Sequence, residues 1–189
     1  MPDHHDDIRA GAERTLQDAY LLPLAEIVDS EKTVQAPPAT TSWLIPDRDR
    51  AVLDLWGLPA RIKAGFFENT PQQALDPALS RYGSGFYLLG RLNHLCIGAE
   101  IGTGAVYVLS EEPASSNSLL NSSIEHYVEC SWRWCAALPV LIQLVDWAWE
   151  PDQLDFYDER RAEVGRNIAA IDPEAASGKG ALWQELTDV

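Results

Sequence analysis

The stretch from Phe86 to Leu109 constrains the fold more than any other part of this chain. Between Leu95 and Ile101 apolar residues alternate with polar or small ones, which is the period of a strand with one buried face. Gly102-Thr103-Gly104 interrupts the pattern, and glycines at both ends suit a tight hairpin because glycine reaches positive φ angles. Residues 105–109 and 86–92 supply a strand on either side. The stretch therefore predicts an antiparallel β-meander.

Helices are expected on the N-terminal side of this meander. Apolar residues recur at helical spacing from Ile8 to Val28, and Pro23 is expected to end the first helix or begin a second. A short helix is predicted from Pro46-Asp47 to Trp56. Gly57 then closes it, since glycine commonly follows the last helical residue. Residues 64–67 are expected to form an edge or opening strand, and residues 69–77 an irregular segment.

Two long helices are expected after the meander. Ser122 and Glu125 have the spacing of a capping box, so the first helix starts near this pair. Pro139 is expected to kink or divide it, because its ring removes one backbone hydrogen bond. An acidic helix is predicted over residues 150–174, with Leu154 in its buried stripe. A short closing helix is expected around Trp183.

A chain of 189 residues with 46% hydrophobic content is long enough for one well-buried core and short for two. We expect a single α+β domain over residues 11–189, with the antiparallel meander packed by N-terminal and C-terminal helices. Residues 1–10 are expected to form a flexible tail. Residues 3–7 of that tail have metal-ligand side chains, but a chain terminus supplies little rigid geometry.

The composition favours a cytoplasmic protein. No apolar stretch approaches the roughly 20 residues of a membrane span, and the N-terminus is acidic and polar where a signal peptide is basic and then apolar. Cys96, Cys130 and Cys135 are an odd number within apolar patterns, so reduced core thiols are expected rather than disulfides.

The formal net charge of −15 disfavours nucleic acid as a direct partner, since lysine and arginine supply most affinity for phosphates. Two interpretations of the acidic surface stay open. It keeps the protein soluble, or it steers the chain toward a basic partner.

One pair of residues has the composition of a reactive site. His94 and Cys96 lie two residues apart on one strand face, with Glu100 further along, as in a nucleophilic cysteine–histidine pair or part of a zinc site. No second cluster completes four ligands, and His126 is the only other histidine outside the tail. The glycine-rich segments also lack the fingerprint of a phosphate-binding loop. No catalytic residue, metal or cofactor is therefore expected, and a small hydrolase using His94 and Cys96 remains the alternative.

The seven tryptophans are many for this length. Trp132 and Trp134 cannot share one helix face, and neither can Trp147 and Trp149. Each pair is expected either to pack between neighbouring helices or to leave one ring partly exposed, as an interface anchor is.

The order of several weak motifs resembles the SUKH superfamily of bacterial toxin-immunity proteins, in particular its fourth subfamily. The resemblance covers roughly residues 50 to 186. Its motifs are Trp56-Gly57-Leu58-Pro59, Phe66-Phe67, Leu89-Gly90, Leu95-Cys96-Ile97-Gly98, Thr103-Gly104-x-Val106, Asn121-Ser122-Ser123-Ile124 and Ile171-Asp172 before Leu182-Trp183.

The resemblance implies a non-enzymatic α+β domain that binds and neutralises a cognate toxin, and the toxins of many members are nucleases. A basic toxin, no membrane contact, and a monomer or weak homodimer are expected. A cytoplasmic scaffold of the same fold that binds a host partner stays open. Spacings of three and four residues place several acids of the 150–174 helix on one exposed face. The candidate partner-binding residues are Asp152, Asp155, Asp158, Glu159, Glu111 and Glu112.

Overall fold

The structure of the protein is a computed structural model. It describes residues 4–29, 33–34, 42–62, 67–72, 85–92, 95–109, 117–176 and 183. The helices within these ranges are α1 (His4–Leu21), α2 (Leu24–Ile27), α3 (Asp47–Trp56), α4 (Ile124–Trp147), α5 (Pro151–Ile171) and α6 (Pro173–Ala176). The strands are β1 (Thr33–Val34), β2 (Leu58–Pro59), β3 (Arg61–Ile62), β4 (Phe67–Gln72), β5 (Phe86–Leu92), β6 (Leu95–Glu100), β7 (Val106–Leu109) and β8 (Ser118–Asn121).

The predicted α+β fold with an antiparallel meander is confirmed. Strands β3 to β8 form one sheet in the order of the sequence, each antiparallel to the next. The meander is longer than the three strands expected. Residues 69–72, which were predicted to be irregular, belong to β4, because they pair with β5 across a register shift. The short strands β1 and β2 pair separately.

The predicted hairpin between β6 and β7 is also confirmed. Gly102 and Gly104 have φ angles of 92° and 75°, which side chains rarely adopt. The backbone N–H of Gly102 donates to the carbonyl of Leu44 at 2.6 Å. The hairpin is therefore anchored to the segment that precedes α3.

Both faces of the central strand β6 are buried, whereas the alternation of apolar with polar or small residues predicted only one buried face. Ile97 and Ala99 face the main core, which includes Trp43 stacked on Tyr87 with ring centroids 4.4 Å apart. Cys96, expected on the polar face, lies instead in a second apolar cluster with Leu88 and Leu109. Successive side chains of a strand point to opposite faces, so Cys96 belongs to the face away from Ile97.

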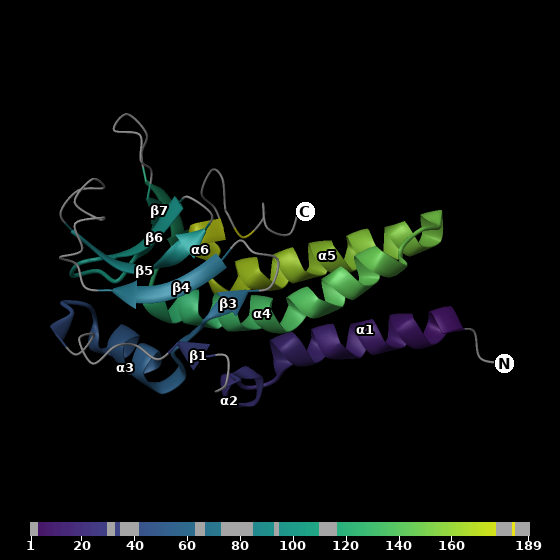
Figure 1. Ribbon diagram of the computed structural model, residues 1–189, viewed down its shortest axis with the longest axis horizontal. Helices are drawn as coiled ribbons and strands as arrows, with labels where there is room; N and C mark the ends of the chain where they lie inside the picture. The colour runs from purple at the N-terminus through teal and green to yellow at the C-terminus, as the bar shows by residue number, and fades with distance from the viewer. Residues whose placement is uncertain are drawn as a thin grey trace.

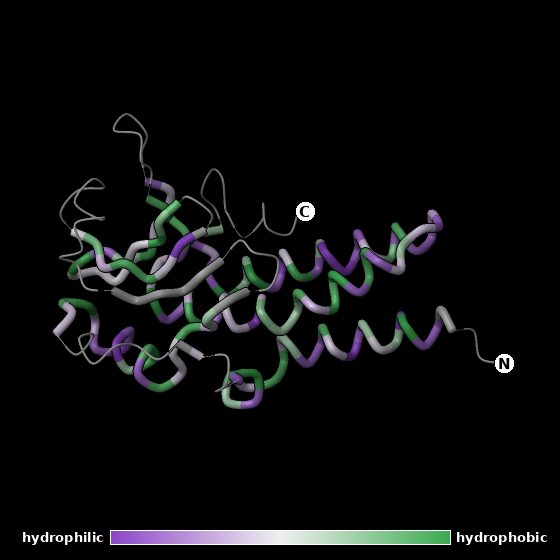
Figure 2. Tube along the Cα trace, in the orientation of Figure 1, coloured by the Kyte–Doolittle hydropathy of each residue, from purple (hydrophilic) through white to green (hydrophobic). Residues whose placement is uncertain are grey.

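Three helices lie side by side and project beyond the sheet (Figure 1). We call α1 and the parts of α4 and α5 beyond the sheet the helical arm. The sheet packs on the other half of α4, so the two layers overlap over only part of the length of the helices. Figure 2 shows hydrophobic and hydrophilic residues alternating along α1 and α5, as expected for helices with one buried face.

The prediction of a tail over residues 1–10 is wrong for the residues that the structure describes. Helix α1 begins at His4 and buries Ala12, Leu16 and Ala19, while Ile8 packs against the same core. The spacing of these residues gives α1 one apolar face, which α4 and α5 cover. The polar sequence at the start of the chain reflects the solvent-facing side of a helix. The predicted break at Pro23 is confirmed, because α2 follows it directly.

Helix α4 begins close to the predicted residues, but without the predicted capping box. Its N-cap is Ser123, whose side chain accepts from the backbone N–H of His126 at 3.1 Å. Glu125, the expected partner of Ser122 in a capping box, instead forms a salt bridge with Arg48 of α3. Pro139 does not divide the helix, which runs on to Trp147.

Helix α5 carries a capping box that was not predicted. The side-chain oxygen of Gln153 accepts from the backbone N–H groups of Trp149 and Glu150 at 3.0 and 3.1 Å. Leu154 was placed in the buried stripe, but it is exposed, and the stripe consists of Tyr157, Val164 and Ile168. As predicted, Asp172-Pro173 ends this helix and α6 follows.

Candidate functional site

The cysteine of the predicted reactive pair is inaccessible. The Cys96 side chain is fully buried between Leu88 and Leu109, and His94 lies outside the described residues. Glu100 accepts a hydrogen bond from the Thr103 hydroxyl at 2.5 Å within the hairpin. Burial also raises the pKa of the Cys130 thiol to about 12, so that thiol stays protonated at neutral pH. Cys96 is therefore not accessible to act as a nucleophile.

No group of three or more histidine, cysteine, aspartate or glutamate side chains within the described ranges is arranged to hold a metal ion.

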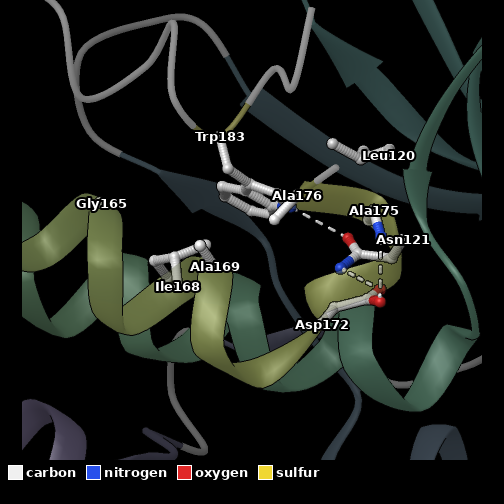
Figure 3. A pocket seen from close by; sticks show the side chains of 9 residues that line it. All are labelled: Leu120, Asn121, Gly165, Ile168, Ala169, Asp172, Ala175, Ala176 and Trp183. Atoms are coloured by element: carbon white, nitrogen blue, oxygen red, sulfur yellow. Dashed lines mark hydrogen bonds between the residues drawn. The ribbon is translucent and has the colours of Figure 1, made fainter. Parts of the chain in front are cut away.

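A polar cluster that the sequence analysis missed joins β8, α4 and α5. The buried carboxylate of Asp172 accepts from the backbone N–H of Ser122 at 2.6 Å and from the Asn121 side chain at 3.1 Å. The Asn121 oxygen in turn accepts from the Trp183 indole at 3.0 Å (Figure 3). Asn121 thereby connects Asp172 to the far C-terminal segment of the chain.

His126 and Ser122 complete this cluster, and their geometry excludes a catalytic triad. The same ring nitrogen, His126 Nδ1, lies 2.9 Å from Ser122 Oγ and 3.5 Å from Asp172 Oδ2. A triad needs the serine on one ring nitrogen and the carboxylate on the other, so that the histidine passes a proton between them. The three residues therefore hold elements together and do not activate a nucleophile.

The ionisation of Asp172 fits this structural role. Burial opposes its charge, but hydrogen bonds from Ser122, Asn121 and the N–H of Ala175 outweigh burial and lower the pKa of Asp172. The adjoining cavity, between Leu120, Ile168 and Trp183, has about 10 Å³. A space of that size holds about one water molecule and no organic ligand. The only sequence signal for this cluster was Asp172 directly before Pro173, a pair that predicts a helix boundary but does not predict that the aspartate is buried.

Four of the six acids proposed from the sequence are exposed on α5, and three of these four have cationic partners. Asp152 pairs with Arg9 of α1 at 2.7 Å, and the other two pairs, Asp158 with Arg161 and Glu159 with Arg160, lie within α5. Asp155 is exposed and makes no ion pair within the described part of the chain. Glu111 and Glu112 lie outside the described residues. The surface remains acidic, although its charge is partly neutralised.

The two tryptophan pairs differ from each other. Trp132 and Trp134 are both buried, because the first half of α4 is covered on nearly all sides by the sheet, α2 and α3. Trp147 is half-buried beneath α1, whereas Trp149 is 83% exposed. Only the pair of Trp147 and Trp149 therefore has an exposed ring.

The family model described as SUKH-4 immunity protein matches residues 22–188. The chain belongs to the SUKH-4 immunity protein family. This confirms the resemblance seen in the sequence and extends it toward the N-terminus, since the match includes α2 and the segment before α3. Searches of curated proteins and of solved structures found no match.

Helix α1 lies entirely before the residues of this SUKH-4 family member that the family model matches. It spans His4–Leu21, and the match begins at residue 22. In this chain the helical arm therefore combines two helices of the family region with one that precedes it.

Among the described residues, no helix has the length and apolar character needed to cross a membrane.

Proposed function

We propose that this SUKH-4 family member confers immunity by binding a cognate protein toxin in the cytoplasm of a bacterium, without catalysis of its own. The family match carries this proposal, because it covers most of the chain with a family of immunity proteins. The buried Cys96 and the geometry of His126 weigh against the hydrolase alternative.

The charge of the chain supports a basic toxin. With a net charge of −15 and exposed acids along α5, the protein attracts cationic surfaces at long range. Nuclease toxins are cationic in many cases, because their substrate is a polyanion. We propose Asp152, Asp155, Asp158 and Glu159 as part of the toxin-facing surface, with Glu111 and Glu112 as further candidates.

The proposal is tested with the protein encoded by the adjacent gene. Co-expression of the chain should restore growth to cells that produce this protein, and the purified chain should inhibit its activity at one chain per molecule. Inhibition that saturates at this ratio supports stoichiometric binding. Protection by catalytic amounts of the chain would indicate an enzyme instead, and a lack of both rescue and binding would favour the scaffold alternative.

A further inference from the structure

The end of the helical arm carries four exposed apolar side chains, which we call the tip patch. Trp149 is 83% exposed, and Val145, Leu154 and Ile142 are 48%, 47% and 39% exposed. Ile142 and Val145 are three residues apart, which places them on one side of α4, and Trp149 follows directly after the extended C-cap residue Ala148. Isolated exposed apolar residues are ordinary, but a cluster of four is a feature of interaction sites.

Contacts of Arg9 show that Val145 and Leu154 of the tip patch lie on the side of the arm away from α1. The Arg9 guanidinium lies 5.7 Å from the Trp147 ring centroid and 5.3 Å from that of Phe156. One helical residue corresponds to a rotation of about 100°, so a residue two positions away points about 200° from its neighbour. Val145 is two positions from Trp147, and Leu154 is two from Phe156. Both therefore lie on the side of their helices opposite α1.

Further along the arm, the same side of α5 is covered by the sheet. Gly165 comes eleven residues after Leu154, which is about three helical turns, so the two residues lie on one side of α5. Gly165 lines the cavity beside Leu120 of β8. The sheet ends before the tip (Figure 1), and the tip patch is the continuation of this covered side where no described element covers it.

Trp149 is held in place before any partner arrives. Its backbone N–H donates to the Gln153 side chain at 3.0 Å, and its indole N–H donates to the Asp146 carbonyl at 2.9 Å. A fixed aromatic ring loses little conformational entropy when it is buried in an interface. Tryptophan is also enriched among the residues that carry most of the binding energy. Trp149 has the properties of an anchor.

Charge around the tip patch indicates which partner it fits. Three exposed acids, Asp146, Glu150 and Asp155, adjoin the residues of the tip patch in sequence, whereas Asp152 is paired with Arg9 on the α1 side of the arm. We propose that the tip patch, with Trp149 as its anchor, is the surface that docks a basic protein presenting an apolar pocket within its cationic face. This inference rests on the proposed function, and its partner is the cognate toxin.

The same charges disfavour a second copy of this chain as the occupant. A two-fold contact through the tip patch would bring the same acidic border together from both copies. Like charges facing each other in a partly desolvated interface oppose association. The same acids instead favour association with a basic partner, because opposite charges attract.

The test compares single variants in binding kinetics with the adjacent-gene protein. Trp149→Ala should raise Kd at least about 30-fold, through faster dissociation and with little change in the salt dependence of association. Val145→Ser should weaken binding in the same way but less. Leu55→Ser is the matched control, because Leu55 is 68% exposed on α3 at the other end of the molecule, and it should bind like the wild type. Unchanged urea midpoints establish that the variants are folded.

Three results of the binding comparison would contradict the proposal. If the wild type binds and Trp149→Ala and Val145→Ser bind equally well, the tip patch is not the docking surface and this inference is wrong. If the wild type itself does not bind, the proposed function fails together with the inference. If sedimentation shows that the variants only dissociate a dimer while toxin binding persists, the patch is a contact between copies, which also overturns the proposal.

Discussion

At the scale of single residues, Gly104 is constrained both by its backbone and by its surroundings. Its φ of 75° disfavours any side chain, and an added Cβ would overlap the Asp49 carboxylate and lie 3.1 Å from Pro46. Asp49 is buried and accepts from the backbone N–H of Glu125 at 2.9 Å, so it connects α3 to the start of α4. A side chain at Gly104 would displace this connection.

We expect Gly104→Ala to lower the free energy of unfolding by more than the matched change Gly102→Ala. Gly102 also has a positive φ, of 92°, but nothing lies within 4 Å of its added Cβ. Backbone strain alone should cost about 1 kcal/mol at either position, and the displacement of Asp49 should add at least a further ~1 kcal/mol at Gly104. Equal urea midpoints for the two variants would show that the contact with Asp49 is unimportant.

Asp172 gives a prediction about pH. Its pKa is lowered in the folded chain, so its contribution to stability is complete above the unfolded value of about 3.9 and is lost as pH falls through the folded value. Asp172→Asn should therefore destabilise the protein by about 2 kcal/mol at pH 7, through its lost charged hydrogen bonds. This difference should shrink below about pH 4.

Urea unfolding of the wild type and Asp172→Asn at pH 7 and pH 3.5 measures this difference. Asp155→Asn is the control, because Asp155 is exposed on α5, and it should change little at either pH. A destabilisation by Asp172→Asn that is equal at both pH values would contradict the assignment of the effect to the ionised carboxylate.

At the scale of elements, α1 shows how a helix outside the family match belongs to the core. Leu16→Ala in α1 should lower the free energy of unfolding by about 2–4 kcal/mol, because Leu16 is buried against α4 and α5 and its loss leaves a cavity. Gln17→Ala, on the exposed side of the same turn, should remain within about 0.5 kcal/mol of the wild type. A neutral Leu16→Ala in denaturant unfolding would mean that α1 is not packed on the arm in solution.

At the scale of the whole molecule, the acidic surface should govern the rate of association with a basic toxin. Asp155→Lys/Glu159→Lys should slow association about tenfold at low salt and reduce its salt dependence, since charge steering is screened beyond about 8 Å at physiological ionic strength. Both positions are exposed on α5. Asp54→Lys on α3 is the single-charge control for a general effect of net charge. Stopped-flow kinetics with the adjacent-gene protein, compared across salt concentrations, provides the measurement. An unchanged association rate would place the toxin on another surface.

Several features of this protein followed from local sequence alone. The meander, the hairpin at Gly102 and Gly104, and the short helix closed by Gly57 were predicted, because strand alternation and glycine's positive φ are properties of a few neighbouring residues. The order of weak motifs also identified the family. The exposed acids of α5 were found for the same reason, since helical spacing places them on one face.

Other features were decided only by the tertiary structure, because they depend on what covers each face. The same two-residue spacing buries both Trp132 and Trp134 yet leaves Trp149 exposed, since the sheet covers the start of α4 and stops short of the tip. The burial of Cys96 depends on strands paired across the sheet. Asp172 meets Asn121 over 51 positions of sequence, a contact that no local pattern encodes. Sequence determined the elements, whereas packing determined which of their faces remain free to bind a partner.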